Sequence, residues 1–226
     1  MSSPLIFCTS YFKDSAAWEN RYRRWIDYYS KVFPGEALFL IDDGSPFTPS
    51  DDDVQLNTDV ERLVLGRTAS IFRFEHRLGR KPGLNYPGWF RSFVFSTEIA
   101  KRLGLTKIIH LESDAYILTR KALDYFTKTN TGWSVFWCPR YSFPETGLQI
   151  ICSDQIPTLE SVAAKTYSAF ANRPVEKLLP YTHIEKNIFG NRYGEYRTRV
   201  PGYADFAVQI NAKTRFRSEL VNDESG

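Results

Sequence analysis

Apolar and polar residues alternate along the first half of the chain in blocks that predict strands and helices in turn. Short apolar runs at residues 4–9, 37–41 and 107–111 are typical of buried strands. Two longer segments, 18–33 and 90–103, place their apolar residues at helical spacing. This order predicts an α/β fold with a mostly parallel central sheet and helices on both faces, a Rossmann-like arrangement of three layers.

The remaining patterns are weaker and less regular. They predict strands at 62–65 and 71–74, a helix at 122–128, strands at 133–138 and 148–152, and a helix at 158–171. From residue 174 onward the pattern assigns few elements. No repeat or low-complexity linker interrupts the 226 residues, so a single domain over 1–226 is the economical interpretation.

Polar residues follow three of the predicted strands, at 7–11, 42–45 and 112–114. In a parallel sheet these ends emerge at one edge, where open α/β sheets bind their ligands. On an extended strand Glu112 and Asp114 point to the same side and could converge on one cation. Hard oxygen ligands of this kind suit Mn²⁺ or Mg²⁺ with a bound diphosphate. Each segment alone is more often a structural turn, but together they favour a site.

The amino-acid composition limits the classes of binding partner that we expect. The formal charge of +3, from 29 Lys and Arg against 26 Asp and Glu, fits an anionic small ligand better than nucleic acid. It is also compatible with peripheral association at the inner face of an anionic membrane. No apolar run has membrane-spanning length, the start is unlike a signal peptide, and the three cysteines lie in apolar runs. We therefore expect a cytoplasmic protein with buried thiols. The aromatic residues suit either a core or a sugar-stacking surface.

Three segments carry a family resemblance. IDDGSP at 41–46 resembles the DDGS turn of the large inverting family that includes cellulose and hyaluronan synthases. GWFRSF at 88–93 resembles the helix that precedes the metal motif in such enzymes, and ESD at 112–114 resembles that motif, DxD, with Glu in first place. Over its first half the chain is thus similar to nucleotide-sugar-dependent glycosyltransferases of the GT-A fold.

The resemblance implies transfer of a sugar from a nucleoside-diphosphate sugar, a UDP-sugar rather than a GDP-sugar, to a glycan or glycolipid in polysaccharide biosynthesis. It implies Mn²⁺ or Mg²⁺ as the cofactor. Residues 1–118 would form the donor-binding half and residues 119–226 the acceptor-binding half.

The resemblance also implies roles for individual residues. Thr9 and Tyr11 would line the base, Asp42 or Asp43 would bind base or ribose, and Arg91 would approach the nucleotide. Ser113 would face the ribose, Asp114 would bind the metal, and Glu112 would bind the ribose or the metal. His183 could be a third metal ligand, as in some retaining relatives, or a surface or core histidine. Arg77, Arg80 and Lys81 could contact the diphosphate from their loop, or simply be solvated.

An inverting enzyme also needs a carboxylate base for the acceptor hydroxyl. The candidates are Glu185, Asp154 and Glu145. Glu185 ranks first, because it begins a polar segment where inverting relatives keep an acidic pair, although Lys186 follows it here. A retaining enzyme would not need this base.

Two other interpretations stay open. A sugar-nucleotide nucleotidyltransferase expects a glycine-rich loop with Arg and Lys soon after the first strand, and residues 8–12 contain none of these. A non-catalytic carbohydrate-binding module would explain the aromatic residues but would give the acidic strand ends no role.

Overall fold

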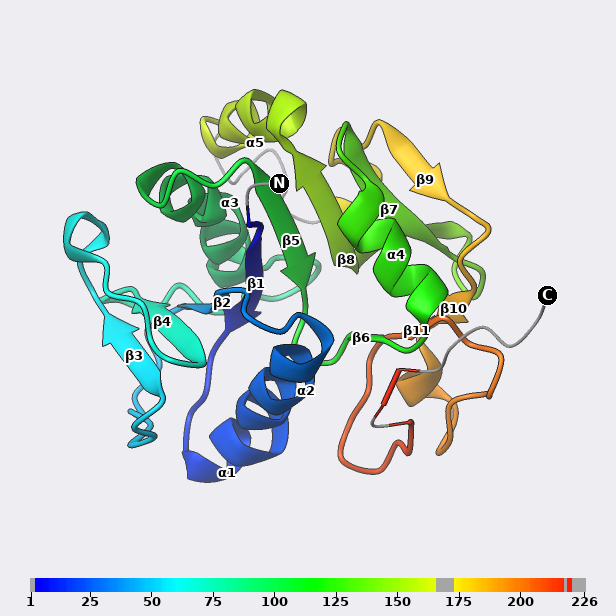
Figure 1. The fold of residues 1–226 in the computed structure, drawn as a ribbon, viewed down its shortest axis with the longest axis horizontal. Coiled ribbons are helices and arrows are strands. Elements are labelled where there is room, and N and C mark those ends of the chain that lie inside the picture. Colours follow the sequence, from blue (N-terminus) through cyan, green and yellow to red (C-terminus); the bar gives the residue numbers. More distant parts are fainter. Residues whose placement is uncertain (1–2, 166–172, 218, 221–226) are drawn as a thin grey trace.

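The computed structural model describes residues 3–165, 173–217 and 219–220. An eight-stranded sheet runs through the molecule in the order β3-β4-β2-β1-β5-β8-β7-β9 (Figure 1). Its strands are β1 Leu5–Ser10, β2 Leu38–Asp42, β3 Val54–Asn57, β4 Ala69–Arg73, β5 Lys107–Leu111, β7 Trp133–Cys138, β8 Phe143–Cys152 and β9 His183–Glu185. Only β8 is antiparallel to its neighbours, β5 and β7. The predicted mostly parallel α/β sheet is confirmed.

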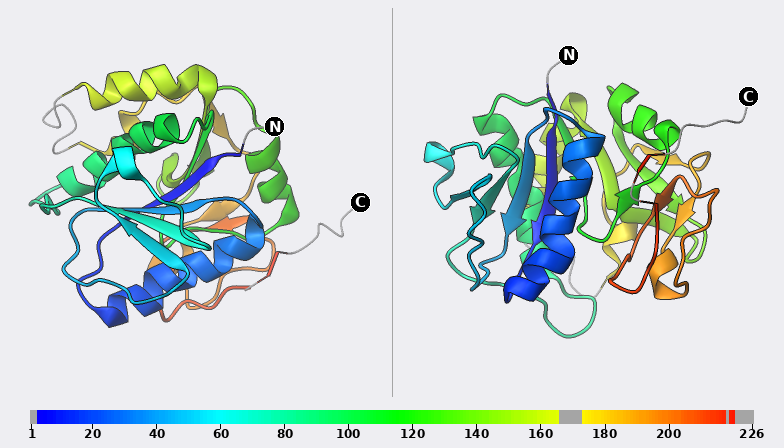
Figure 2. Two further views of the ribbon diagram at one scale, coloured as in Figure 1. Left: turned by 60° about the vertical axis from the view of Figure 1, so that its left-hand side comes forward. Right: turned by 60° about the horizontal axis from the view of Figure 1, so that its bottom comes forward.

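Helices cover both faces of this sheet, as Figure 2 shows. One face carries α4 and a continuous helix made of α1, a π-helical segment and α2; the other carries α3 and α5. The helical bounds are α1 Ser15–Ala17, the π-helix Trp18–Arg23, α2 Arg24–Val32, α3 Pro87–Arg102, α4 Arg120–Lys128 and α5 Ile156–Ala163. Successive residues of β1 serve the two cores: Ile6 and Cys8 face one, Leu5 and Phe7 the other.

A small second sheet lies beyond the end of β5. It has the order β10-β11-β6, formed by Gly190–Asn191, Phe206–Ala207 and Tyr116–Ile117. β6 comes directly after the acidic turn at 112–114, and its antiparallel pairing with β11 connects that turn to the last part of the described chain.

The structure differs from the sequence prediction at three elements. Residues 62–65, which are among the described residues, do not form the expected strand. A 3-10 turn at Val60–Arg62 is followed there by extended backbone. The edge strand of the sheet is Val54–Asn57 instead. Only one of its four residues is buried, so it has no apolar pattern to recognise. β8 begins at Phe143, and α5 ends at Ala163. Residues 166–171 of the helix expected at 158–171 lie outside the described residues.

Buried tyrosines fix the backbone around the sheet's carboxyl edge. The Tyr22 hydroxyl accepts from the Tyr11 amide at 3.0 Å and donates to the Tyr11 carbonyl at 3.1 Å. The Tyr29 hydroxyl donates to the Ala115 carbonyl at 2.8 Å and accepts from the Ile117 amide at 3.3 Å. Some of the chain's aromatic residues therefore hold the carboxyl edge of the sheet in place from within the core.

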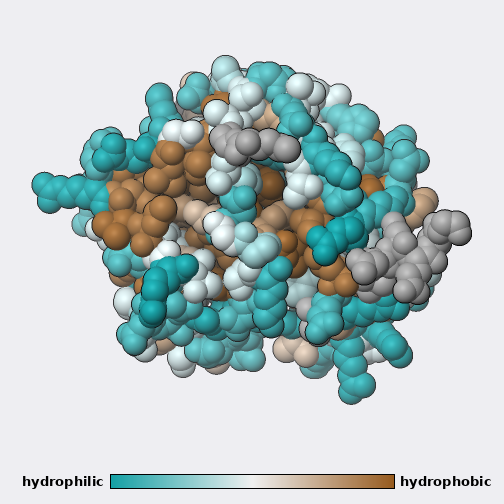
Figure 3. Space-filling model, in the orientation of Figure 1, coloured by the Kyte–Doolittle hydropathy of each residue, from teal (hydrophilic) through white to brown (hydrophobic). Residues whose placement is uncertain are grey.

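The three cysteines are buried and free, as the sequence predicts. Among the described residues, no helix is long and apolar enough to cross a membrane. On the face drawn in Figure 3, hydrophilic side chains form most of the outline, and hydrophobic ones are exposed in areas between them.

Candidate functional site

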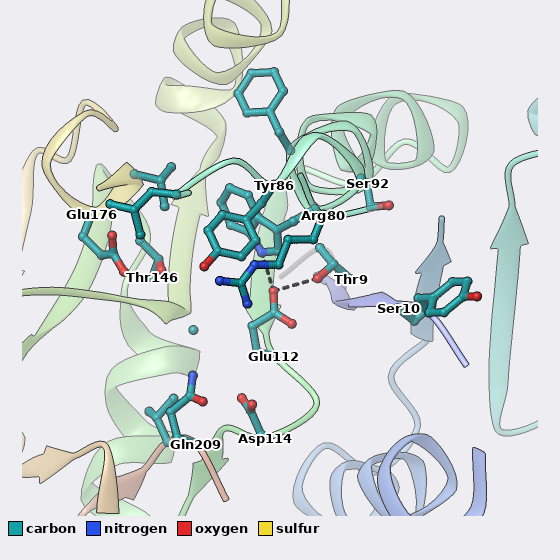
Figure 4. A pocket seen from close by; sticks show the side chains of 18 of the residues that line it. Thr9, Ser10, Arg80, Tyr86, Ser92, Glu112, Asp114, Thr146, Glu176 and Gln209 are labelled. Atoms are coloured by element: carbon teal, nitrogen blue, oxygen red, sulfur yellow. Dashed lines mark hydrogen bonds between the residues drawn. The ribbon is translucent and has the colours of Figure 1, made fainter. Parts of the chain in front are cut away.

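A pocket of about 830 Å³ opens at the carboxyl ends of β1, β2 and β5. Figure 4 shows Thr9 and Glu112 on one side of it and Thr146 and Glu176 on the other. The expectation that the three polar strand ends meet at one edge is confirmed, because these strands are parallel. Residues from both halves of the sequence line the same space.

Glu112 is held by three donors that share one carboxylate oxygen. Its Oε1 accepts hydrogen bonds from Thr9 Oγ1 at 2.7 Å, Trp89 Nε1 at 2.5 Å and His110 Nε2 at 3.0 Å. Burial by itself opposes ionisation, but the contacts with His110, Thr9 and Trp89 outweigh it and lower the pKa of Glu112 below its usual range. The side chain is therefore a fixed carboxylate whose Oε2 is left for a ligand.

The tautomer of His110 follows from a chain of hydrogen bonds across the sheet. The indole of Trp133 can only donate, so Gln149 Oε1, 2.9 Å away, must be its acceptor. The Gln149 amide nitrogen then faces His110 Nδ1 at 3.2 Å and donates to it. With Nδ1 accepting, the proton of a neutral ring lies on Nε2 and points to Glu112. The network thus orients the His110 ring so that Nε2 faces Glu112.

Asp114 lies two residues further on, in a turn. The Ala115 amide donates to the Glu112 carbonyl at 2.9 Å, so Glu112 and Asp114 are not on an extended strand and the same-side argument fails. Both still line the pocket, but with different partners: Arg21 lies 3.2 Å from Asp114 Oδ2 and also donates to the hydroxyl of Ser113. Burial raises the pKa of Asp114 to about 6, although Arg21 lowers it.

Of the three expected metal ligands, Glu112 and Asp114 line the pocket and His183 does not. His183 lies on β9, at the opposite edge from β3, where its ring stacks on Tyr125 and is 3.5 Å from Glu185. Within 3–165, 173–217 and 219–220, no three His, Cys, Asp or Glu side chains form a group that could hold a metal ion. At the acidic turn, Asp114 is paired with the Arg21 guanidinium, and Glu112 Oε1 already accepts three hydrogen bonds. These two carboxylates do not fit a metal centre built from protein ligands.

The two aspartates of the DDGS turn have separate roles. Asp42 is fully buried beneath Arg73, whose Nε is 2.6 Å from its Oδ2, and it is not among the described residues that line the pocket. Asp43 does line it, yet its oxygens accept from Arg91 and from the Leu78 and Gly79 amides. The expectation of base or ribose binding is therefore not supported for Asp42. Asp43 fastens the loop after β4 to the pocket.

Arg91 itself pairs with Asp43 and with the His76 carbonyl, and packs over Phe74 outside the described pocket lining. Within the loop, Arg77 and Arg80 line the pocket and Lys81 does not. Arg77 lies over the ring of Tyr11, 3.7 Å from its centre.

The far side of the pocket contains two linked carboxylates. Arg192 Nε is 2.6 Å from Glu145 Oε2, and its terminal nitrogen is 3.0 Å from Glu176 Oε1. Glu145 Oε1 also accepts from the Gly147 amide at 2.9 Å, and the Gly147 carbonyl accepts from the Glu112 amide at 2.9 Å. Burial raises the pKa of Glu145 above its usual range in spite of Arg192. The hydrogen bond from the Glu112 amide to the Gly147 carbonyl therefore connects the segment of Glu145 to Glu112.

The other two candidate bases lie elsewhere. Asp154 is exposed and accepts from the Gly132 amide with both oxygens, which lowers its pKa and fixes a turn. Glu185 on β9 accepts from the Asn187 amide and contacts His183. Neither is among the described residues that line the pocket. Of the three candidates, only Glu145 reaches it.

Sequence reasoning missed several residues that line or support the site. These are Arg21, Trp89, His110, Gln149, Glu176 and Arg192. Trp89 lies in the GWFRSF segment, where the resemblance pointed two residues further on. Arg21 occupies a polar position of an amphipathic helix, which in sequence is typical of a solvated face. For His110 the sequence signal is its position near the end of a predicted strand, two residues before Glu112.

Comparison with known proteins adds only a likeness of fold. No protein-family model and no curated protein matches the chain. Among solved structures, one described as a glycosyltransferase involved in the glycosylation of the major capsid of PBCV-1 is similar at 10% sequence identity and a TM-score of 0.45. The likeness covers 91% of this chain and 93% of that one. At this level it carries no argument about activity.

Proposed function

We propose that the protein is a glycosyltransferase of the GT-A type that transfers a sugar from a nucleoside-diphosphate sugar, with UDP favoured, to a carbohydrate acceptor. The observation that carries this is one continuous pocket, which runs from the carboxyl ends of β1, β2 and β5 to the carboxylates linked by Arg192. A transferase of this kind needs a donor site and an acceptor site that share one reaction space.

The donor is assigned to the side formed by β1, the loop at 75–86 and the acidic turn. Tyr11 and Arg77 offer flat surfaces for a base, and Arg77 and Arg80 offer positive charge for a diphosphate. Glu112 Oε2 is suited to accept from a ribose or sugar hydroxyl, because its three Oε1 donors keep it ionised and oriented.

For the chemistry we assign Glu145 as the base of an inverting transfer. The acceptor hydroxyl attacks the anomeric carbon, the bond from that carbon to the diphosphate oxygen breaks, and its electron pair leaves with the nucleoside diphosphate. The acceptor proton goes to Glu145, whose raised pKa makes it a better proton acceptor than an exposed glutamate. Arg192 and Glu176 position this carboxylate.

Thermal-shift measurements with a panel of UDP- and GDP-sugars test the donor assignment. We expect a concentration-dependent rise in Tm for one nucleotide, and its loss in Glu112→Gln, because ligands that bind only the folded state stabilise it. Glu160→Gln, a change on α5 outside the described pocket lining, is the control. If no nucleotide sugar raises Tm, the assignment is wrong.

A further inference from the structure

A guanidinium occupies the acidic turn where the sequence motif predicts a divalent cation. Arg21 contacts Asp114 at 3.2 Å and the Ser113 hydroxyl, and it lines the same pocket as Glu112. Its side chain is 49% exposed, so its outer nitrogens reach the pocket space. The turn therefore already contains a permanent positive charge.

The helix holds this charge in place from inside the core. Arg21 lies in the π-helical segment Trp18–Arg23, between the buried side chains of Trp18 and Tyr22. Tyr22 is bonded to the Tyr11 backbone at the end of β1, so the backbone of the segment is fixed against the donor edge. π-Helical turns are rare and occur frequently at functional sites.

We propose that Arg21 supplies the positive charge for the donor diphosphate, so that nucleotide binding and transfer do not depend on a divalent metal. This rests on the proposed function. A guanidinium has five N–H donors; Asp114 and Ser113 engage two nitrogens on one side of the group, and the remaining N–H groups can donate to phosphate oxygens. Asp114 then acts as a positioning residue for Arg21.

The charges of the pocket agree with this assignment. As the anomeric carbon–oxygen bond breaks, its electron pair stays on the diphosphate, and a cation already in position stabilises that charge. Arg77 and Arg80 also line the pocket, and within the described part of the chain neither pairs with a carboxylate. Arg21 differs from them because it projects from a helix that packs on the core and is oriented by two side-chain partners.

Calorimetry of UDP and GDP binding tests the proposal, with each protein measured in EDTA and in Mn²⁺. We expect wild-type affinity in EDTA to lie within about threefold of that in Mn²⁺, since the charge is already supplied. Arg21→Gln should weaken binding in EDTA by about 10- to 100-fold, the loss of charge-assisted hydrogen bonds. The affinity of Arg21→Lys in EDTA should lie between those of the wild type and Arg21→Gln, because lysine keeps the charge but lacks the planar set of N–H donors.

Arg24→Gln is the matched control, an arginine on the same helix that stacks over Tyr116 and Phe216 away from the pocket. It should bind like wild type. Wild-type binding that requires Mn²⁺, or Arg21→Gln binding equal to wild type in EDTA, would overturn the role of Arg21 and leave the donor assignment intact. Absence of UDP and GDP binding by the wild-type protein in both buffers would overturn both.

Discussion

The side-chain amide of Gln149 on β8 donates a 3.2 Å hydrogen bond to Nδ1 of His110 on the neighbouring strand β5. This contact is buried, and it determines which ring nitrogen carries the proton that faces Glu112. The orientation of a pocket carboxylate thus depends on an amide that is itself outside the described pocket lining.

We predict that Nε2 of His110 carries the proton that faces Glu112, while Nδ1 accepts from Gln149. Long-range ¹H–¹⁵N NMR distinguishes the two nitrogens directly. Gln149→Leu removes the donor to Nδ1 and leaves the Trp133 indole without its acceptor, which should cost about 1–3 kcal/mol in the free energy of unfolding. A ring protonated on both nitrogens in the wild-type protein would contradict this network.

Thr9 provides a nearly isosteric test of the Glu112 contacts. Thr9→Val removes the hydroxyl that donates to Glu112 at 2.7 Å, so we expect a loss of about 1–2 kcal/mol in unfolding free energy and weaker UDP binding. Thr9→Ser retains the hydroxyl and should preserve UDP affinity. Equal UDP affinity in the valine and serine variants would show that the bond has no part in holding Glu112 for the ligand. Urea unfolding and calorimetry provide the two measurements.

Asp114→Asn should stabilise the fold in a pH-dependent manner. Burial raises the pKa of Asp114 from 3.8 to about 6, so above pH 6 the folded protein carries a charge that the unfolded chain holds at lower cost. Removing it should add up to about 3 kcal/mol to the unfolding free energy at pH 8. The gain should shrink as the pH falls below 6, should be about 0.5 kcal/mol at pH 4, and should vanish only well below 3.8, where both states are protonated. Urea unfolding at pH 8, 6 and 4 checks this; a gain that does not change with pH would contradict it.

Gly88 allows Asp43 to fasten the loop after β4. A Cβ at this position would collide with Asp43 Oδ2, and the Gly79 amide is also close. Gly88→Ala should therefore cost about 1–3 kcal/mol in stability and release residues 78 and 79 from Asp43. Limited trypsin digestion should then cut faster after Arg77 and Arg80. Gly202→Ala, whose Cβ would meet only the end of Arg217, is the control and should digest like wild type.

Glu145→Gln should reduce the rate of sugar transfer by about 10²–10⁴-fold, the usual contribution of general acid–base catalysis. UDP affinity should change little, because the base acts on the acceptor. Glu185→Gln and Asp154→Asn should retain full activity, since neither residue lines the described pocket. Single-turnover rates measure the effect. A larger loss in Glu176→Gln than in Glu145→Gln would move the base to Glu176.

The sequence predicted the central strands of the sheet and the edge at which three polar strand ends meet. Apolar runs such as Lys107–Leu111 and Trp133–Cys138 matched strands, and the polar ends of β1, β2 and β5 meet at one pocket. Periodicity failed at Val54–Asn57, because an edge strand with little burial has no apolar face to reveal it.

The partners of the site could not be predicted in the same way. Asp42 and Asp43 are adjacent in sequence, but one is buried under Arg73 and the other faces the pocket. Glu145 and Arg192 are separated by 46 intervening residues and meet only through the fold. No local sequence pattern distinguishes Asp42 from Asp43 or connects Glu145 with Arg192. Only the structure therefore identifies which carboxylates line the pocket.

The π-helical segment gives one helix two registers. In an α-helix each turn closes on the fourth residue, whereas a π turn takes in one more. On one side of that extra residue, Trp25 and Tyr29 remain in phase with the core; on the other, Arg21 is in phase with the acidic turn. A three-nucleotide deletion in this stretch would therefore rotate Arg21 about the helix axis relative to Trp25 and Tyr29, and would move the core residues Trp18 and Tyr22 with it.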